Sequence, residues 1–142
     1  MCAVFVILSI ASACPESRDD QVSPERVAAY RARIPELAED DCQRHETLAS
    51  LAGPACPPAS TRFHGAVADL LAWVPRTWEK QILAIAGICR GRAYRFAQSE
   101  LDRRPESELL VEGLEAAPGC LREQFALLED VARREGVLLT SE

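Results

Sequence analysis

The chain has 142 residues and a formal net charge of −6. A dedicated nucleic-acid-binding protein needs a basic surface to contact phosphates, so this charge argues against that class. Apolar residues make up 48% of the sequence, aromatic residues only 6%, and alanine is abundant. This composition is sufficient for one hydrophobic core and favours closely packed helices over sheet.

The N-terminal segment is the most distinctive part of the sequence. Residues 3–13 are apolar or small and carry no charge, whereas charged residues are frequent from Glu16 onward. A helix of this length would span about 16 Å, which is too short to cross a hydrocarbon core about 30 Å thick. The segment ends in Ala11-Ser12-Ala13, whose small side chains suit a signal peptidase, and Cys14 follows directly.

This pattern resembles the signal of a bacterial lipoprotein, in which the cysteine after the small residues receives lipid. The resemblance implies that residues 1–13 are a cleaved export signal and that Cys14 becomes the lipidated first residue. Residues 14–22 are then a lipidated cysteine followed by a flexible polar tether. We therefore expect a membrane anchor at Cys14 and a location in the cell envelope, facing the periplasm or the exterior.

The number of cysteines agrees with this expectation. The chain has six, and the loss of Cys2 with the signal and of Cys14 to the lipid leaves four. An even number suits two disulfides in an oxidising compartment. Two alternatives stay open: a secreted soluble protein without lipid, and a cytosolic protein with free thiols. In the cytosolic alternative, residues 3–13 are a buried helix of the core.

Helical periodicity begins after the tether. Ser23 is expected to cap a helix that has Pro24 at its first position and apolar residues at helical spacing. Pro35 lacks a backbone donor and is expected to break or kink this helix. A second helical stretch is expected at 36–52, and a loop rich in proline is expected at 53–60.

The second half of the chain predicts helices at 61–73, 76–103, 106–116 and 120–135. The second of these is expected to be the longest, and its Gly87 and Gly91 would allow another helix to approach closely. Pro118-Gly119 predicts a turn before the last helix, and Gly136 predicts the C-terminal cap of that helix.

The expected fold is all-α: a bundle of four or more helices, formed by a single domain at 23–142 and stapled by two disulfides. Four cysteines allow three pairings. If the chain after the longest helix folds back along it, Cys120 returns to the level of Cys89, within reach of a disulfide. The favoured pairing is therefore Cys89 with Cys120, and Cys42 with Cys56.

His45 is a candidate for metal binding, because it follows Asp41 and Cys42 on one helical face. A zinc site takes three or four ligands, however, and the only other histidine is His64. Asp41 also belongs to the acidic run 39–41, which is interpreted as a solvated helix face. No metal and no cofactor are therefore expected.

Ser60, His64 and Asp69 supply the three residue types of a nucleophilic triad. The sequence has no GxSxG motif, and Ser60 is better explained as the cap of the helix predicted at 61–73. It also has no CxxC pair for redox exchange. The prediction is a protein that is not an enzyme.

The candidate interaction surface combines two tryptophans at a helix junction with a dense group of arginine and tyrosine residues. Its members are Trp73, Trp78, Arg90, Arg92, Tyr94 and Arg95. Within this group Arg90 and Tyr94 are one helical turn apart, where a guanidinium can stack on an aromatic ring.

The sequence thus predicts a non-enzymatic, lipid-anchored cell-envelope protein whose helical domain is a structural or protein-interaction module. The expected partners are the membrane, through the lipid on Cys14, and another envelope protein. The alternative function is a helical bundle that binds a small ligand or a metal, with His45, His64 and the two tryptophans near a pocket. The further alternative is the cytosolic helical protein described above.

Overall fold

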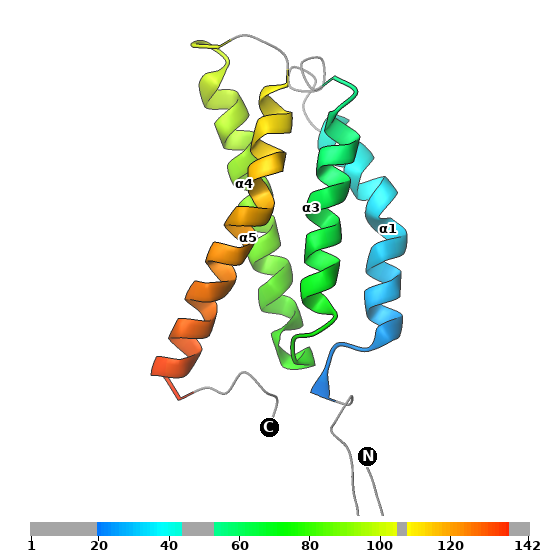
Figure 1. Ribbon diagram of the computed structural model, residues 1–142, viewed down its shortest axis with the longest axis vertical. Helices are drawn as coiled ribbons and strands as arrows, with labels where there is room; N and C mark the ends of the chain where they lie inside the picture. Colours follow the sequence, from blue (N-terminus) through cyan, green and yellow to red (C-terminus); the bar gives the residue numbers. More distant parts are fainter. Residues whose placement is uncertain (1–19, 44–52, 105–107, 137–142) are drawn as a thin grey trace, which may run out of the picture.

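The computed structural model describes residues 20–43, 53–104 and 108–136. Four long helices run along a common direction, which confirms the predicted all-α bundle (Figure 1). In chain order they are α1 (Pro24–Gln43), α3 (Cys56–Leu71), α4 (Glu79–Glu100) and α5 (Leu109–Arg134), with a 3₁₀ turn η2 (Arg76–Trp78) before α4. Among the described helices, none has the length and apolar character needed to span a membrane.

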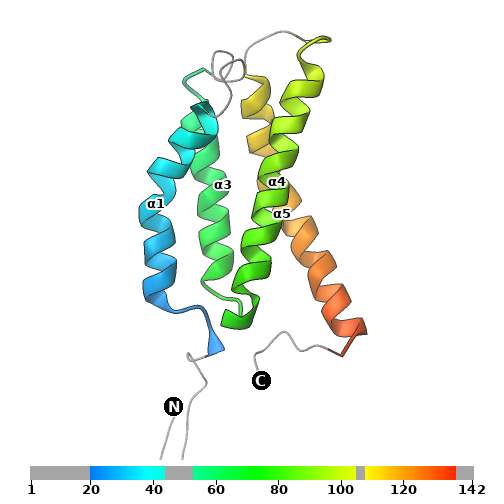
Figure 2. The same cartoon turned by 180° about the vertical axis from the view of Figure 1, so that it is seen from behind.

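Helix α1 begins as the sequence predicts. The Ser23 hydroxyl accepts a hydrogen bond from the backbone N–H of Arg26 at 3.2 Å. The helix continues through Pro35 to Gln43, so this proline does not break it, although the helix axis bends near its middle (Figure 2). Pro35 is exposed, and the carbonyl that loses its helical donor is therefore open to water. The rest of the predicted second stretch, 44–52, lies outside the described residues.

Helix α3 begins at Cys56, inside the segment that the sequence predicts to be a loop. Two prolines lie in its first turn, where backbone N–H groups have no acceptor within the helix. The N–H groups that these prolines lack therefore cost the helix no hydrogen bond. Gly53 makes the turn before the helix with a φ of +70°. The predicted loop is therefore wrong in its second half, and Ser60 lies inside the helix rather than at its cap.

Helix α4 is shorter than the helix predicted at 76–103, because η2 forms the first turn and Leu101 ends the helix. The longest described helix is α5 instead. Residues 109–134 form one continuous helix where the sequence predicts a short helix, a turn at Pro118-Gly119 and a last helix.

The continuity of α5 across Pro118 has a packing explanation. Leu114, Ala117 and Leu121 are all buried, and they fall on one helical face on both sides of the proline. Their burial favours the helical path, which outweighs one lost backbone hydrogen bond. The predicted cap at Gly136 is confirmed, with a φ of +77°.

The helices pack in two pairs, α1 on α3 and α4 on α5, and α3 joins the pairs by packing on α5. A close approach between α4 and α5 occurs at Gly113, where an added Cβ would lie 2.9 Å from the Cα of Ala93. An added Cβ at Gly87 would have no neighbour within 4 Å, and one at Gly91 would meet only an Arg95 nitrogen at 3.3 Å. The close approach predicted at these last two glycines is therefore wrong.

Both predicted disulfides are present. Cys42–Cys56 joins the end of α1 to the start of α3, with a Cα–Cα distance of 6.0 Å. Cys89–Cys120 joins α4 to α5, with a Cα–Cα distance of 5.7 Å. The pairing favoured from helix geometry is confirmed.

The apolar core has two parts. We call the first the terminal cluster, because it lies at the end of the bundle where the described chain begins and ends (Figure 1); the second is the distal cluster. The terminal cluster includes Phe63, Ile82, Cys89, Leu121 and Phe125. The distal cluster includes Cys42, Ala59, Ala93, Leu110 and Leu114.

A polar layer separates the two clusters. Its buried polar residues are Asp41, Ser60 and His64. On α3, Ser60 lies between Ala59 of the distal cluster and Phe63 of the terminal cluster. The fold therefore brings a group of polar side chains to the middle of the bundle.

Candidate functional site

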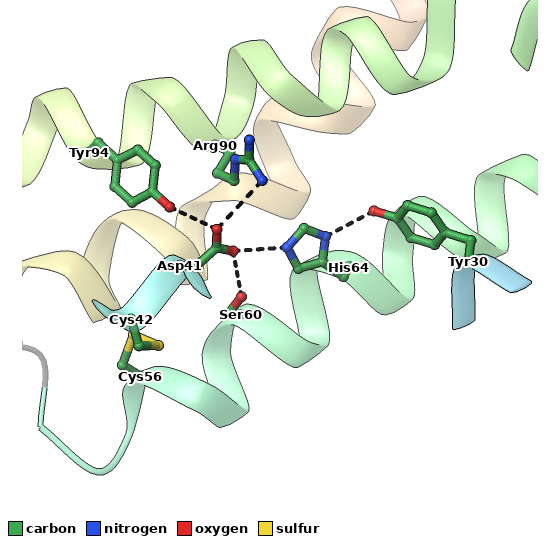
Figure 3. A network of polar contacts seen from close by, with 8 residues as sticks. All are labelled: Tyr30, Asp41, Cys42, Cys56, Ser60, His64, Arg90 and Tyr94. Atoms are coloured by element: carbon green, nitrogen blue, oxygen red, sulfur yellow. Dashed lines mark hydrogen bonds and ion pairs between the residues drawn. A yellow bond between two sulfur atoms is a disulfide. The ribbon is translucent and has the colours of Figure 1, made fainter. Parts of the chain in front are cut away.

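Asp41 is the centre of the polar layer, with only 1% of its surface exposed. Its Oδ1 accepts a hydrogen bond from the Tyr94 hydroxyl at 2.7 Å. Its Oδ2 accepts from the Ser60 hydroxyl at 2.7 Å and lies 2.8 Å from Nε2 of His64 (Figure 3). The Arg90 guanidinium is the fourth partner of this carboxylate, with Nη1 at 3.6 Å from Oδ1. Three helices, α1, α3 and α4, are thus joined through one carboxylate.

The charge of this carboxylate follows from its surroundings. Burial alone favours the neutral acid, but the hydrogen bonds from His64, Ser60 and Tyr94 outweigh it and lower the pKa of Asp41 below its usual value. Asp41 is therefore an anion at neutral pH and can only accept hydrogen bonds. It follows that Nε2 of His64 carries a hydrogen and donates a hydrogen bond to Asp41.

Tyr30 occupies the other side of the histidine ring. Its hydroxyl oxygen lies 2.9 Å from Nδ1 of His64. Burial raises the pKa of Tyr30 to about 12, so the phenol keeps its proton at neutral pH. The hydroxyl can therefore donate to Nδ1, and the chain of contacts runs from Tyr30 through His64 to Asp41.

The polar layer opens into a groove whose lining residues come from α1, α3 and α4. A cavity of about 140 Å³ lies in this groove. The residues that line it are Tyr30, Arg33 and Leu37 of α1, His64 of α3, and Leu83, Ala86, Gly87 and Arg90 of α4. The site thus combines hydroxyl, imidazole and guanidinium groups with a short apolar wall.

Ser60, His64 and Asp69, the three residue types of a triad that the sequence contains, do not assemble into one. Asp69 is exposed and pairs with Arg31, with 2.8 Å between the charged atoms. Ser60 donates to Asp41 rather than to the histidine. A nucleophilic serine needs a hydrogen bond to its base, so this arrangement is not that of a serine hydrolase.

The predicted interaction surface is only partly exposed. Trp73 has 53% of its surface exposed, but Trp78 and Tyr94 are buried, at 6% and 9%. Trp78 packs edge-on against Phe125, with 6.2 Å between ring centroids. Tyr94 and Arg90 both reach Asp41. These residues were predicted to lie on one surface because the sequence does not show which helix faces meet the neighbouring helices.

The three predicted arginines also separate. Arg90 lines the groove, whereas Arg92 is exposed and its side chain reaches toward α5, with Nη1 at 4.0 Å from Glu123 and 3.6 Å from Sγ of Cys120. Arg95 is exposed. Arg90 therefore belongs to the polar layer and the other two belong to the outer face of α4.

Two residues that the sequence singled out lie outside the described residues: Cys14, the predicted lipidation site, and His45, a candidate ligand for which no metal was expected. In the parts of the chain that the structure describes, no group of three or more histidine, cysteine or acidic side chains is placed to hold a metal ion.

The central role of Asp41 was missed by the sequence analysis, which interpreted it as part of a solvated acidic run. A signal for its burial is present, because Asp41 follows Ile34 by two helical turns and shares its face with Ala38. Tyr30 lies on the same stripe and is half-buried beside the groove.

Comparison of the chain with protein-family models, with curated proteins and with solved structures finds no match.

Proposed function

We propose that this chain is a lipid-anchored protein of the cell envelope whose helical domain acts by binding a partner rather than by catalysis. The observation that carries the proposal is the pairing of Cys42 with Cys56 and of Cys89 with Cys120. Such disulfides persist in oxidising compartments and are rare in the cytosol. Cys14, at the end of the apolar segment, is then the cysteine that the N-terminal pattern assigns to the lipid.

The position of the chain ends is compatible with an anchor. The described chain enters the bundle at Asp20 and leaves α5 at the same end (Figure 1). A fully extended tether from Cys14 to Asp20 spans roughly 20 Å, at about 3.3–3.6 Å per residue. In the proposed arrangement the terminal cluster faces the membrane and the Cys42–Cys56 disulfide faces away from it.

The chemistry of the polar layer favours binding over catalysis. Tyr30, His64 and Asp41 have the connectivity of a hydroxyl, a base and an orienting carboxylate. Burial raises the pKa of the Tyr30 phenol to about 12, so this hydroxyl is protonated at neutral pH and can donate a hydrogen bond. Asp41 and His64 themselves are buried, at 1% and 3% exposure.

The outer face of α4 is the surface that we assign to the envelope partner. Ile88 is a large apolar side chain with 44% of its surface exposed. Arg92 and Arg95 lie one and two turns further along the same face and are exposed. Arginine is enriched at protein interfaces, so an exposed apolar side chain on one helical face with two arginines suits such a surface.

Intact mass tests the anchor and the compartment together. The native protein would be extracted from membranes with detergent and weighed with and without reduction. We expect the mass of residues 14–142 plus acyl chains, and an increase of four hydrogens on reduction because two disulfides open. A Cys14→Ser variant is the control and should lose the acyl mass. An unprocessed chain that begins at Met1 and carries free thiols would contradict the proposal.

Site-specific photo-crosslinking tests the binding surface. A photoreactive residue would replace Ile88 in cells that make the full chain, and the matched control would replace Ala29, which is exposed on α1. We expect one discrete crosslinked envelope protein from position 88 and none from position 29. The absence of any adduct at position 88, or the same adducts at both positions, would argue against a partner on this face.

A further inference from the structure

The groove between α1 and α4 has a charge that its own residues do not balance. Two guanidinium groups line it: Arg33 on α1 and Arg90 on α4. Arg90 is paired with Asp41, whose Oδ1 lies 3.6 Å from Nη1. Arg33 forms no ion pair or hydrogen bond with another described residue. The two positive charges and the one negative charge leave a single net positive charge at the groove.

The dimensions of the groove limit what it can hold. A cavity of about 140 Å³ is similar in size to an apolar protein cavity of roughly 150 Å³ that binds benzene. The occupant therefore has on the order of six heavy atoms. Leu37, Leu83 and Ala86 form an apolar wall, so part of that occupant should be hydrocarbon.

We propose that this groove binds a small organic carboxylate with a short hydrocarbon chain. Arg33 holds the carboxylate, since a guanidinium fork matches its two oxygens, and Arg90 supplies the second positive charge. The hydrocarbon chain lies against Leu37 and Leu83. A monoanion matches the single net charge of the site, whereas inorganic phosphate carries more charge and has no hydrocarbon for the apolar wall.

Gly87 provides a structural test of the same site. It lines the cavity, and an added Cβ there would have no neighbour within 4 Å. A larger side chain at this position therefore projects into free space rather than into packed atoms. Gly87→Leu should occupy the groove while the helix keeps its fold, because leucine has a higher helix propensity than glycine.

The inference goes beyond the proposed function, because it assigns a second binding site, and it does not depend on the lipid anchor. The experiment uses the detergent-extracted full chain and measures binding of butyrate by calorimetry and by amide chemical-shift changes. Butyramide, the neutral isostere, and inorganic phosphate are titrated in parallel. The variants are Arg33→Gln, which removes the unpaired charge, Gly87→Leu, which fills the groove, and Arg122→Gln, a matched control at an exposed arginine of α5 outside the groove.

We expect saturable binding of butyrate with shifts confined to residues of the groove. Arg33→Gln should weaken it about tenfold or more, because a hydrogen bond to a charged group typically contributes about 1.5–3 kcal/mol, and a factor of ten is 1.4 kcal/mol. Gly87→Leu should abolish binding, and Arg122→Gln should leave it unchanged.

Several outcomes would overturn the inference. These are the absence of saturable butyrate binding, equal binding of butyramide, tighter binding of phosphate than of butyrate, and an Arg33→Gln affinity equal to that of the native chain. None of them would affect the mass of the processed protein, so a failure of this inference is distinguishable from a failure of the proposed anchor.

Discussion

Asp41 is a charged side chain in a position that is almost completely closed to water, with 1% of its surface exposed. A buried charge is stable only when it is paired and hydrogen-bonded. Asp41 meets this condition through the hydroxyls of Ser60 and Tyr94, the imidazole of His64 and the guanidinium of Arg90. The five side chains therefore depend on one another, and the loss of the carboxylate leaves four groups without their acceptor.

We expect Asp41→Asn to destabilise the protein by about 3 kcal/mol. The amide keeps the shape of the carboxylate, but it loses the charge that pairs with Arg90 and points N–H donors at other donors. This figure is at the lower end for buried pairs, because the Arg90 side chain is 28% exposed. The matched control is Asp40→Asn, one residue earlier on the exposed face, with an expected effect within about 0.5 kcal/mol. Urea denaturation measures both, and equal stability of the two variants would contradict the role given to Asp41.

The same carboxylate predicts a pH dependence. The pKa of Asp41 is lowered in the folded protein from an ordinary value of 3.8, so the folded state binds this proton less readily than the unfolded state. Its contribution to stability is therefore complete above pH 3.8 and is lost as the pH falls through the lower folded-state value. We expect the difference in unfolding free energy between the native chain and Asp41→Asn to be constant from pH 7 to about pH 5 and to shrink below about pH 4. A difference that is the same at pH 3 and at pH 7 would refute this.

The sequence allowed only part of this site to be predicted. His64 and Ser60 were candidates because they lie one helical turn apart, a relation that periodicity reveals. Asp41 is separated from His64 by 23 positions and from Tyr94 by 53. Contacts over such separations depend on which helix faces meet, and a single sequence does not contain that information.

At the scale of the helices, the packing around two glycines predicts opposite changes in stability when each is replaced by alanine. Gly113→Ala should destabilise the protein by about 1–3 kcal/mol, because the new Cβ would lie 2.9 Å from the backbone of Ala93, which cannot move aside easily. Gly87→Ala should instead stabilise it by up to about 1 kcal/mol, since the position is open and alanine favours helix. Thermal unfolding of the two variants checks the opposite signs. Stabilisation by Gly113→Ala would show that α4 and α5 do not approach closely there.

The boundaries of the helices were predicted less well than their existence. Hydrophobic periodicity located all four described helices, but proline was given too much weight as a helix breaker. Pro35 and Pro118 both lie inside helices. At each site the apolar stripe continues on both sides of the proline, and the free energy of burying that stripe exceeds the loss of one hydrogen bond.

At the scale of the whole molecule, the polar layer divides the apolar core into the terminal and distal clusters. Every described helix passes through both clusters; α1, for example, contributes Val27 to the first and Cys42 to the second. A cluster cannot melt without removing packing from helices that also support the other cluster. The Asp41 contacts, which join three helices between the clusters, strengthen this coupling.

We therefore expect the two clusters to unfold as one unit, and the two tryptophans allow a direct test. Trp78 belongs to the terminal cluster and Trp73 packs edge-on against Phe125 of the same cluster, so tryptophan fluorescence reports on that end of the bundle alone. Far-ultraviolet circular dichroism reports on all helices. With the disulfides intact, urea transitions followed by the two signals should coincide in the native chain, as cooperative unfolding requires. In Asp41→Asn, the midpoints of both transitions should move by the same amount to a lower urea concentration. A loss of helical signal that precedes the fluorescence change would show instead that the distal cluster melts independently and that the polar layer is a boundary rather than a link.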